Sequence, residues 1–108
     1  MDKNTKIRLE AQAKVMKALA HPTRLYLVEL LASGERCVCE LTEEVEAEIS
    51  TVSRHLAQLR HAGVVRHEKR GLKVFYRLNC PCVLDFFTCV DGVLHAVDAE
   101  RRTALGLV

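Results

Sequence analysis

Residues 50–78 read STVSRHLAQLRHAGVVRHEKRGLKVFYRL, and the fold class follows from these residues. The first half places Val52, Leu56 and Leu59 at i, i+4 and i+7, the spacing of one apolar face of a helix. The second half holds two runs rich in β-branched and aromatic residues, separated by the basic, glycine-containing segment 69–72. This pattern predicts a hairpin that follows directly on a helix.

The chain before residue 50 predicts three further helices. A short helix over residues 38–45 would lie only a few residues ahead of the one that begins near Ser50, and that layout is typical of a helix-turn-helix. Further upstream, a helical spacing over about 5–19 stops at His21-Pro22, because proline breaks a helix but suits the first turn of the next. That next helix would end near Ala32, with an apolar face formed by Leu25, Val28 and Leu31.

The chain after the hairpin predicts one more helix, from Cys80-Pro81 to about residue 103. Apolar side chains repeat along it at spacings of 4, 3, 4 and 3, as in a coiled-coil seam. We interpret this stripe as a dimer interface rather than as intrachain packing, because two copies would then place two DNA-reading helices one turn of DNA apart. The stripe consists of Val83, Phe87, Val90, Leu94 and Val97.

Charge is distributed unevenly along the chain. Between Ser50 and Arg77 there are seven Lys or Arg residues and one acid, whereas Glu29–Glu48 holds seven Glu and one Arg. Such a local cationic excess indicates a nucleic-acid surface, although a solvated charged face is the plainer alternative. On the predicted helix the candidate DNA contacts are Ser50, Thr51, Ser53, Arg54, His55 and Gln58, and on the hairpin they are Lys69, Arg70 and Lys73.

Length and composition exclude several classes of protein. A chain of 108 residues suits a single domain, 1–108, and it has no run of 18 apolar residues. Its polar N-terminus lacks the apolar stretch of a signal peptide, so we expect a cytoplasmic protein with no membrane partner. No catalytic triad, phosphate loop or carboxylate pair is present, and no βαβ pattern surrounds the cysteines as in a thiol–disulfide enzyme, so we expect no enzymatic activity and no organic cofactor.

Several motifs, in order and with the right spacing, resemble the ArsR/SmtB family of repressors. They occupy residues 19–25 (LAHPTRL), 37–41 (CVCEL), 50–56 (STVSRHL), 59–65 (LRHAGVV) and 75–78 (FYRL). The resemblance implies a homodimeric winged helix-turn-helix that leaves its double-stranded operator DNA when it binds a metal or metalloid. The expected fold is mostly α with a small β-hairpin, in the order α-α-α-α-β-β-α, and dimeric through its terminal helices.

One segment departs from the family pattern. Where relatives place a glycine in the turn and a serine cap before the second helix of the motif, this chain has Glu46-Ala47-Glu48-Ile49. Glycine is the usual left-handed turn residue, and glutamate is a poor cap. We therefore expect the helix boundary to shift so that Ser50 caps it.

Cys37 and Cys39 match the sensory element of the arsenic-responsive branch of this family. Thiolates suit a soft metalloid, and the start of a helix favours their ionised form. Residues two apart in a regular helix point about 200° apart, so the segment around Cys37 must be non-helical, or must unwind, for both sulfurs to hold one atom. The resemblance implies arsenite or antimonite as the inducer, with cadmium, lead, zinc and copper(I) as alternatives.

The branch also carries a third cysteine at the position of Thr42, so a third ligand would have to come from elsewhere. Cys80 and Cys82 could complete the first site or form a second one, whereas Cys89, inside the apolar stripe, is expected in the core. Asp91 and His95 lack the spacing of the zinc-sensing branch and are expected on a solvated face. Alternatively, the cysteines could respond to oxidant or sulfide by forming a disulfide or polysulfide.

Overall fold

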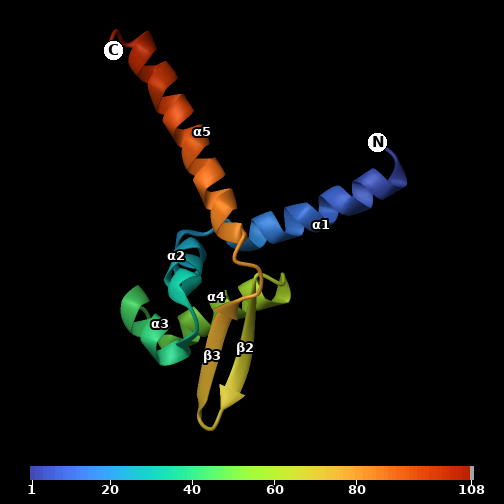
Figure 1. The fold of residues 1–108 in the computed structure, drawn as a ribbon, viewed down its shortest axis with the longest axis vertical. Coiled ribbons are helices and arrows are strands. Elements are labelled where there is room, and N and C mark those ends of the chain that lie inside the picture. The colour runs from blue at the N-terminus through green and yellow to red at the C-terminus, as the bar shows by residue number, and fades with distance from the viewer. Residues whose placement is uncertain (108) are drawn as a thin grey trace.

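The computed structural model describes residues 1–107, and Val108 lies outside the described part of the chain. The helices α2, α3 and α4 gather beside a twisted hairpin, while α1 and α5 extend away from this body in different directions (Figure 1). The expected winged helix-turn-helix is confirmed. In chain order, the elements are α1 (Lys3–Leu19), α2 (Pro22–Leu30), η1 (Leu31–Ser33), β1 (Arg36–Cys37), α3 (Val38–Val45), α4 (Ile49–His61), β2 (Val65–Arg70), β3 (Lys73–Leu78) and α5 (Val83–Ala104).

The sheet has one strand more than the sequence predicts. Its order is β1-β3-β2, all antiparallel, and β1 places Cys37 opposite Phe75. A two-residue strand is too short to show an alternating pattern, so only its pairing with β3 reveals it. The hairpin turn is also tighter than expected, because β2 continues through Arg70 and only Gly71 and Leu72 remain for the turn. Gly71 has a φ of 62°, which a glycine adopts without strain.

The core forms where the helix-turn-helix packs against the base of the sheet. Its fully buried side chains include the predicted face of α4, and each contributes about 1.5–3 kcal/mol by leaving water. Leu25, expected on the buried face of α2, is instead 37% exposed, because the core lies on the side of α2 that carries Leu27 and Val28. The fully buried residues are Leu27, Val28, Leu41, Val52, Leu56, Leu59 and Val65.

The turn between α3 and α4 takes the form that the family pattern implies, but without glycine. Glu46 has a φ of 57°, the left-handed region, and its N–H donates to the Thr42 carbonyl. The expectation that Ser50 caps α4 is wrong: Glu48 is the cap residue and Ser50 lies in the first turn. The Glu48 side chain makes no capping hydrogen bond, so this helix start relies on tertiary packing of Val52 rather than on a side-chain cap.

The Glu46→Gly variant is expected to raise the free energy of unfolding by about 1 kcal/mol, because glycine enters the left-handed region without the Cβ clash. Thermal denaturation should show the gain as a rise in Tm of about 4–8 °C for a domain of this size. Glu44→Gly, which removes the same charge from within α3, is the matched control and should lower stability by about 1 kcal/mol. A lower Tm for Glu46→Gly would contradict the prediction.

The terminal helix begins at Val83 rather than at Cys80-Pro81, because a turn closed by the Val83 N–H on the Cys80 carbonyl (3.2 Å) precedes it. Val83 and Phe87 pack partly against the core. The rest of the predicted stripe and Cys89 are exposed, so the expectation that Cys89 is buried is wrong for the single chain. Among residues 1–107, no helix is long and apolar enough to cross a membrane.

Candidate nucleic-acid interface and thiol pairs

The helix α4 presents one polar face outward from the helix-turn-helix. Its opposite face is locked by Val52, Leu56 and Leu59, so its orientation is fixed by the core. Within the described chain Arg54 makes no ion pair, and it is exposed. The predicted contact residues on this helix are Ser50, Ser53, Arg54 and Gln58, all exposed, with Thr51 and His55 half-buried.

His55 takes part in contacts within the protein. Arg24 Nε on α2 donates to His55 Nδ1 at 3.1 Å, and the rings of His21 and His55 lie 4.4 Å apart between centroids. Burial, followed by electrostatic interactions with His21, Arg24 and Arg54, lowers the pKa of His55. The ring is therefore held neutral with Nδ1 as an acceptor, which lets it tie α2 to α4. We assign His55 a positioning role. Because Nδ1 accepts from Arg24, only Nε2 of this ring is available for a contact with DNA.

The hairpin tip, residues 69–73, is here called the wing. One of its cations, Arg70, is already paired with carboxylates. Arg70 contacts Glu35 through both carboxylate oxygens, at 2.6 and 2.9 Å, and Glu68 at 2.8 Å. Its guanidinium also lies 4.7 Å from the centre of the Phe75 ring. These hydrogen bonds raise the pKa of Arg70 further above its ordinary value. Arg70 therefore anchors the wing to the segment before β1.

The other two wing cations are available. Lys69 and Lys73 are exposed and form no ion pair within residues 1–107. Among the three predicted wing contacts, these two lysines are therefore the better candidates for phosphate. The ion pair between Arg70 and Glu35 could not be predicted from the sequence, because the two residues lie 35 positions apart. The Arg24–His55 contact likewise spans 31 positions. No local spacing signals either contact.

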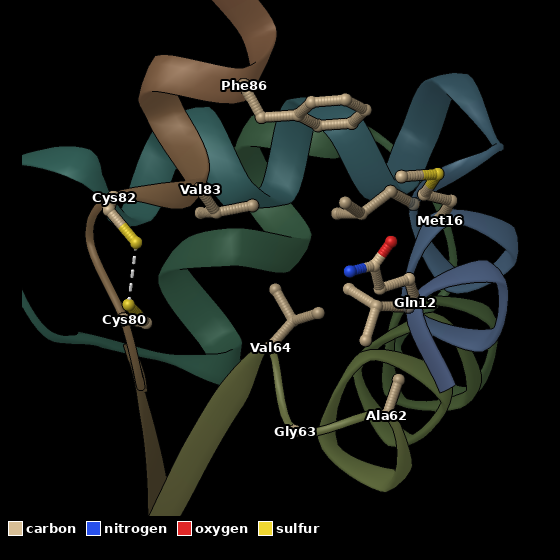
Figure 2. Close-up of a pocket in the computed structure, with 11 residues that line it drawn as sticks. Gln12, Met16, Ala62, Gly63, Val64, Cys80, Cys82, Val83 and Phe86 are labelled. Carbon is tan, nitrogen blue, oxygen red and sulfur yellow. Dashed lines mark hydrogen bonds between the residues drawn. The ribbon is translucent and has the colours of Figure 1, made fainter. Parts of the chain in front are cut away.

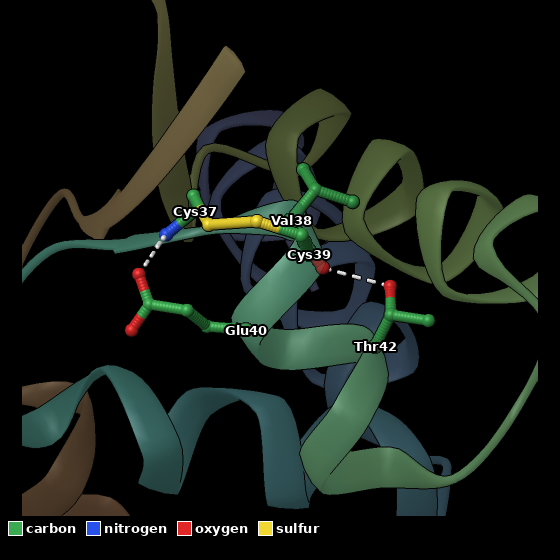
Figure 3. Close-up of a disulfide and its surroundings, with 5 residues drawn as sticks. All are labelled: Cys37, Val38, Cys39, Glu40 and Thr42. Carbon is green, nitrogen blue, oxygen red and sulfur yellow. Dashed lines mark hydrogen bonds between the residues drawn. A yellow bond between two sulfur atoms is a disulfide. The ribbon is translucent and has the colours of Figure 1, made fainter.

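Cys37 and Cys39 meet at the start of α3, where a disulfide joins them (Figure 3). Cys37 is the last residue of β1, with φ −79° and ψ 157°, whereas Cys39 already lies in the helix. The expectation that the segment around Cys37 is non-helical is confirmed, and this break brings two sulfurs together that a regular helix would hold apart. Cys37 is buried and Cys39 is exposed, so the pair is reached from the Cys39 side.

The surroundings of this pair supply no third soft ligand. Thr42 Oγ1 donates to the Val38 carbonyl at 2.7 Å, and the Cys37 N–H donates to Glu40 Oε1 at 3.4 Å (Figure 3). Within the described residues, no group of three or more Cys, His, Asp or Glu side chains is placed to hold a metal ion. In the reduced protein, a soft ion at this pair would have two protein thiolates, and any further ligand would have to come from outside these surroundings.

Cys80 and Cys82 form a second thiol pair, with 2.8 Å between their sulfurs (Figure 2). Both are exposed, and they lie at the edge of an apolar groove of about 600 Å³ between α1 and α5, lined also by Met16, Val83 and Phe86. The shared hydrogen bond with Cys80, and then its charge, raise the pKa of the Cys82 thiol. One of the two sulfurs therefore holds its proton more firmly than a free cysteine.

The two thiol pairs do not share a site within one chain. Cys37 pairs with Phe75, and β3 then carries the chain about 10 Å along the strand to Leu78 before Cys80 is reached. Among the described residues, the cysteines of the two pairs do not form a group of three that could hold a metal ion. The alternative in which Cys80 or Cys82 completes the Cys37–Cys39 site within a single chain therefore finds no support in this geometry. Asp91 and His95 are exposed on α5, as expected.

Known proteins resemble this chain in both sequence and fold. The family described as "Bacterial regulatory protein, arsR family" matches residues 21–67. The arsenic resistance transcriptional regulator ArsR1 of Pseudomonas putida is 48% identical over 90 residues, which cover 82% of this chain and 67% of that protein. A cadmium resistance transcriptional regulatory protein CadC homolog of Staphylococcus aureus is 38% identical over 68 residues, 62% of this chain and 56% of that protein.

The solved structures agree with these relatives. The homodimeric winged helix-turn-helix DNA-binding domain of Mb0332 from Mycobacterium bovis matches with a TM-score of 0.76 and 29% identity. The match covers 95% of this chain and 93% of that one, so it includes both terminal helices.

Proposed function

Because this chain belongs to the arsR family of bacterial regulatory proteins, which are DNA-binding transcriptional regulators and not enzymes, we propose that it is a homodimeric repressor. It binds double-stranded operator DNA through α4 and the wing. It releases that DNA when arsenite or antimonite binds Cys37 and Cys39. The single observation that supports this most strongly is the meeting of the Cys37 and Cys39 sulfurs at the start of the helix-turn-helix.

The position of the thiol pair supplies a route from ligand to DNA. Soft metalloids prefer thiolate ligands, and once the Cys37–Cys39 disulfide is reduced, the start of α3 offers two of them, one with open access. Leu41 on α3 and Leu56 on α4 belong to the same buried cluster, so a shift of α3 is transmitted to α4. A ligand that reshapes the β1–α3 junction therefore changes the orientation of the helix that reads DNA.

Two surfaces of the chain suit its two proposed macromolecular partners, the operator DNA and a second copy of the chain. For DNA we assign Ser50, Thr51, Ser53, Arg54 and Gln58 together with Lys69 and Lys73, while Arg70 holds the wing in place. For the second copy we assign the exposed end of the α5 stripe, which is 41% exposed at Val90, 62% at Leu94 and 55% at Val97. A surface of this kind is costly in water and is typical of an interface. We also propose that the chain acts as the single domain, 1–108, expected from its sequence, of which the structure describes residues 1–107.

The proposed function is tested with the reduced protein and an operator selected from a pool of random DNA. Fluorescence anisotropy should show tight, saturable binding that reverses as arsenite is added, and sedimentation should show a dimer. Failure to enrich any DNA sequence would contradict the assignment as a DNA-binding repressor. A complex that survives millimolar arsenite would contradict the assignment of the inducer.

A thiol-redox sensor is the second candidate, favoured by the Cys37–Cys39 disulfide and by the short distance between the sulfurs of Cys80 and Cys82. In this case peroxide takes two electrons from a pair of thiols, and one disulfide and two water molecules form. Peroxide would then release the operator in the absence of arsenite. Mass spectrometry that finds every thiol still free after release, or no release with peroxide or polysulfide, would remove this candidate.

Thr42→Cys is expected to tighten arsenite binding by on the order of tenfold, because it adds a third thiolate one turn after Cys39. Isothermal titration of the reduced protein with arsenite measures the change. Thr42→Ser, which retains the hydroxyl that donates to the Val38 carbonyl, is the matched control and should bind like the parent protein. Equal affinity of the cysteine variant would show that the third position does not face the bound atom.

A further inference from the structure

A second cationic surface lies beside α4, outside both the helix-turn-helix face and the wing. It is a hollow of about 310 Å³ bounded by α1, α2 and α4, and none of its lining residues is acidic. We propose that this cationic groove holds the sugar–phosphate backbone of the operator, so that α1 and α2 take part in DNA binding. The inference rests on the proposed function. The groove is lined by Lys14, Lys17, Ala18, Arg24, Gln58, His61 and Ala62.

The lysines of the groove lack carboxylate partners. Along α1 there are five Lys or Arg residues and a single acid, Glu10, which lies 4.0 Å from Lys6 at the far end of the helix. Within residues 1–107, Lys14 and Lys17 form no ion pair, and both are exposed. Their charge is therefore not offset locally, unlike that of Arg70 on the wing. An anion that enters the groove would neutralise it.

Arg24 gives the groove a fixed donor. Its Nε donates to His55 Nδ1 at 3.1 Å and its Nη1 donates to the Ala18 carbonyl at 3.3 Å. No hydrogen bond among the described residues uses Nη2. A guanidinium that is already oriented by two hydrogen bonds loses little freedom when it binds a phosphate oxygen. The neutral His55 ring keeps this orientation, because a protonated Nδ1 could not accept from Arg24.

The groove is continuous with the face of α4 that is assigned to DNA. Gln58 belongs to both surfaces, and His61 lies one turn further along the same helix. A duplex that contacts Arg54 and Gln58 would therefore carry its backbone on toward the lysines. B-form DNA presents one negative charge for about every 1.7 Å of axis, so phosphates are available along this path.

A second copy of the chain is the less suitable occupant. The apolar residues of α1 that line the other groove include Val15 and Met16, and Figure 2 labels Met16 there together with Phe86 of α5. At about 100° per residue, Lys14 and Lys17 lie on a different face of α1 from Met16. The face suited to self-association and the face suited to phosphate are thus separate.

The test is the salt dependence of DNA binding by the reduced full chain with the Lys14→Gln and Lys17→Gln changes combined. At about 0.15 M salt the variant is expected to bind both the operator and unrelated DNA on the order of tenfold more weakly. The slope of log K against log salt should fall by about 1 for each phosphate that the variant no longer binds, close to 4 for two lysines in each of the two subunits of the dimer. The matched control combines Lys3→Gln and Lys6→Gln, which remove the same charge from the other end of α1, and its slope should stay unchanged.

Each other outcome counts against the groove. An unchanged slope in the Lys14/Lys17 variant would show that these lysines bind no phosphate. An equal change in the control would show that they act only through overall charge. If sedimentation shows that the variant no longer dimerises, while each dimer that still forms binds DNA with parental affinity, the groove is instead a contact between two copies of the chain. If the parent protein binds no DNA, the proposed function fails; if the parent binds and the variant matches it, only this inference fails.

Discussion

Replacing Cys37 and Cys39 together with serine is expected to abolish the release of operator DNA by arsenite while leaving operator affinity within about twofold of the parent. Serine keeps the size of the side chain but removes the soft ligand, so the arsenite concentration for half release should rise at least ~100-fold. Neither residue lies on the outward face of α4 or on the wing, so DNA contacts remain. Anisotropy of labelled operator titrated with arsenite measures both quantities.

Two cysteine controls locate the sensor. Cys89→Ser changes a single exposed thiol on α5 and should release DNA as the parent does. The combined change of Cys80 and Cys82 to serine tests the second thiol pair independently of the first. Unaltered release by the Cys37/Cys39 variant, with release abolished in the Cys80/Cys82 variant, would contradict the assignment and move the sensor to the start of α5.

The Arg54→Ala variant is expected to weaken operator binding by about 10- to 100-fold, since a base-contacting arginine contributes about 1–3 kcal/mol. Arg54 is exposed on the outward face of α4 and forms no ion pair within the described chain, so its removal leaves the fold intact. If it contacts a base, affinity for the operator should fall more than affinity for unrelated DNA. Parallel titrations of the two DNAs measure this ratio.

The Arg102→Ala change is the matched control for Arg54. It removes the same charge from the last turn of α5, away from the helix-turn-helix, and should alter binding by less than about twofold. An Arg54 variant that binds both DNAs more weakly by the same factor would assign this side chain to a phosphate instead of a base. An Arg54 variant that binds like the parent would remove it from the interface.

Local pattern accounts for most of the fold. The helix predicted over residues 38–45 is α3, with the same bounds, and the α4 stripe of Val52, Leu56 and Leu59 is fully buried as expected. These features depend on the 3.6-residue period, which any segment carries in its own sequence. Helix boundaries are less well predicted: the expected shift of the α4 cap to Ser50 does not occur, because Glu46 adopts the left-handed turn conformation without glycine and Glu48 is the cap residue.

The candidate sites, like the fold, depend partly on local sequence and partly on the tertiary structure. Periodicity, turn residues and close spacing are local properties, so the amino-acid sequence alone specifies the helix-turn-helix, the hairpin and the two cysteine pairs. The folded chain is needed to show which cations are free: Arg70 is held by Glu35, Arg24 is held by His55, and Lys14 and Lys17 remain without carboxylate partners among the described residues. The two arginine contacts join residues 35 and 31 positions apart, and their energies exist only once the chain has folded.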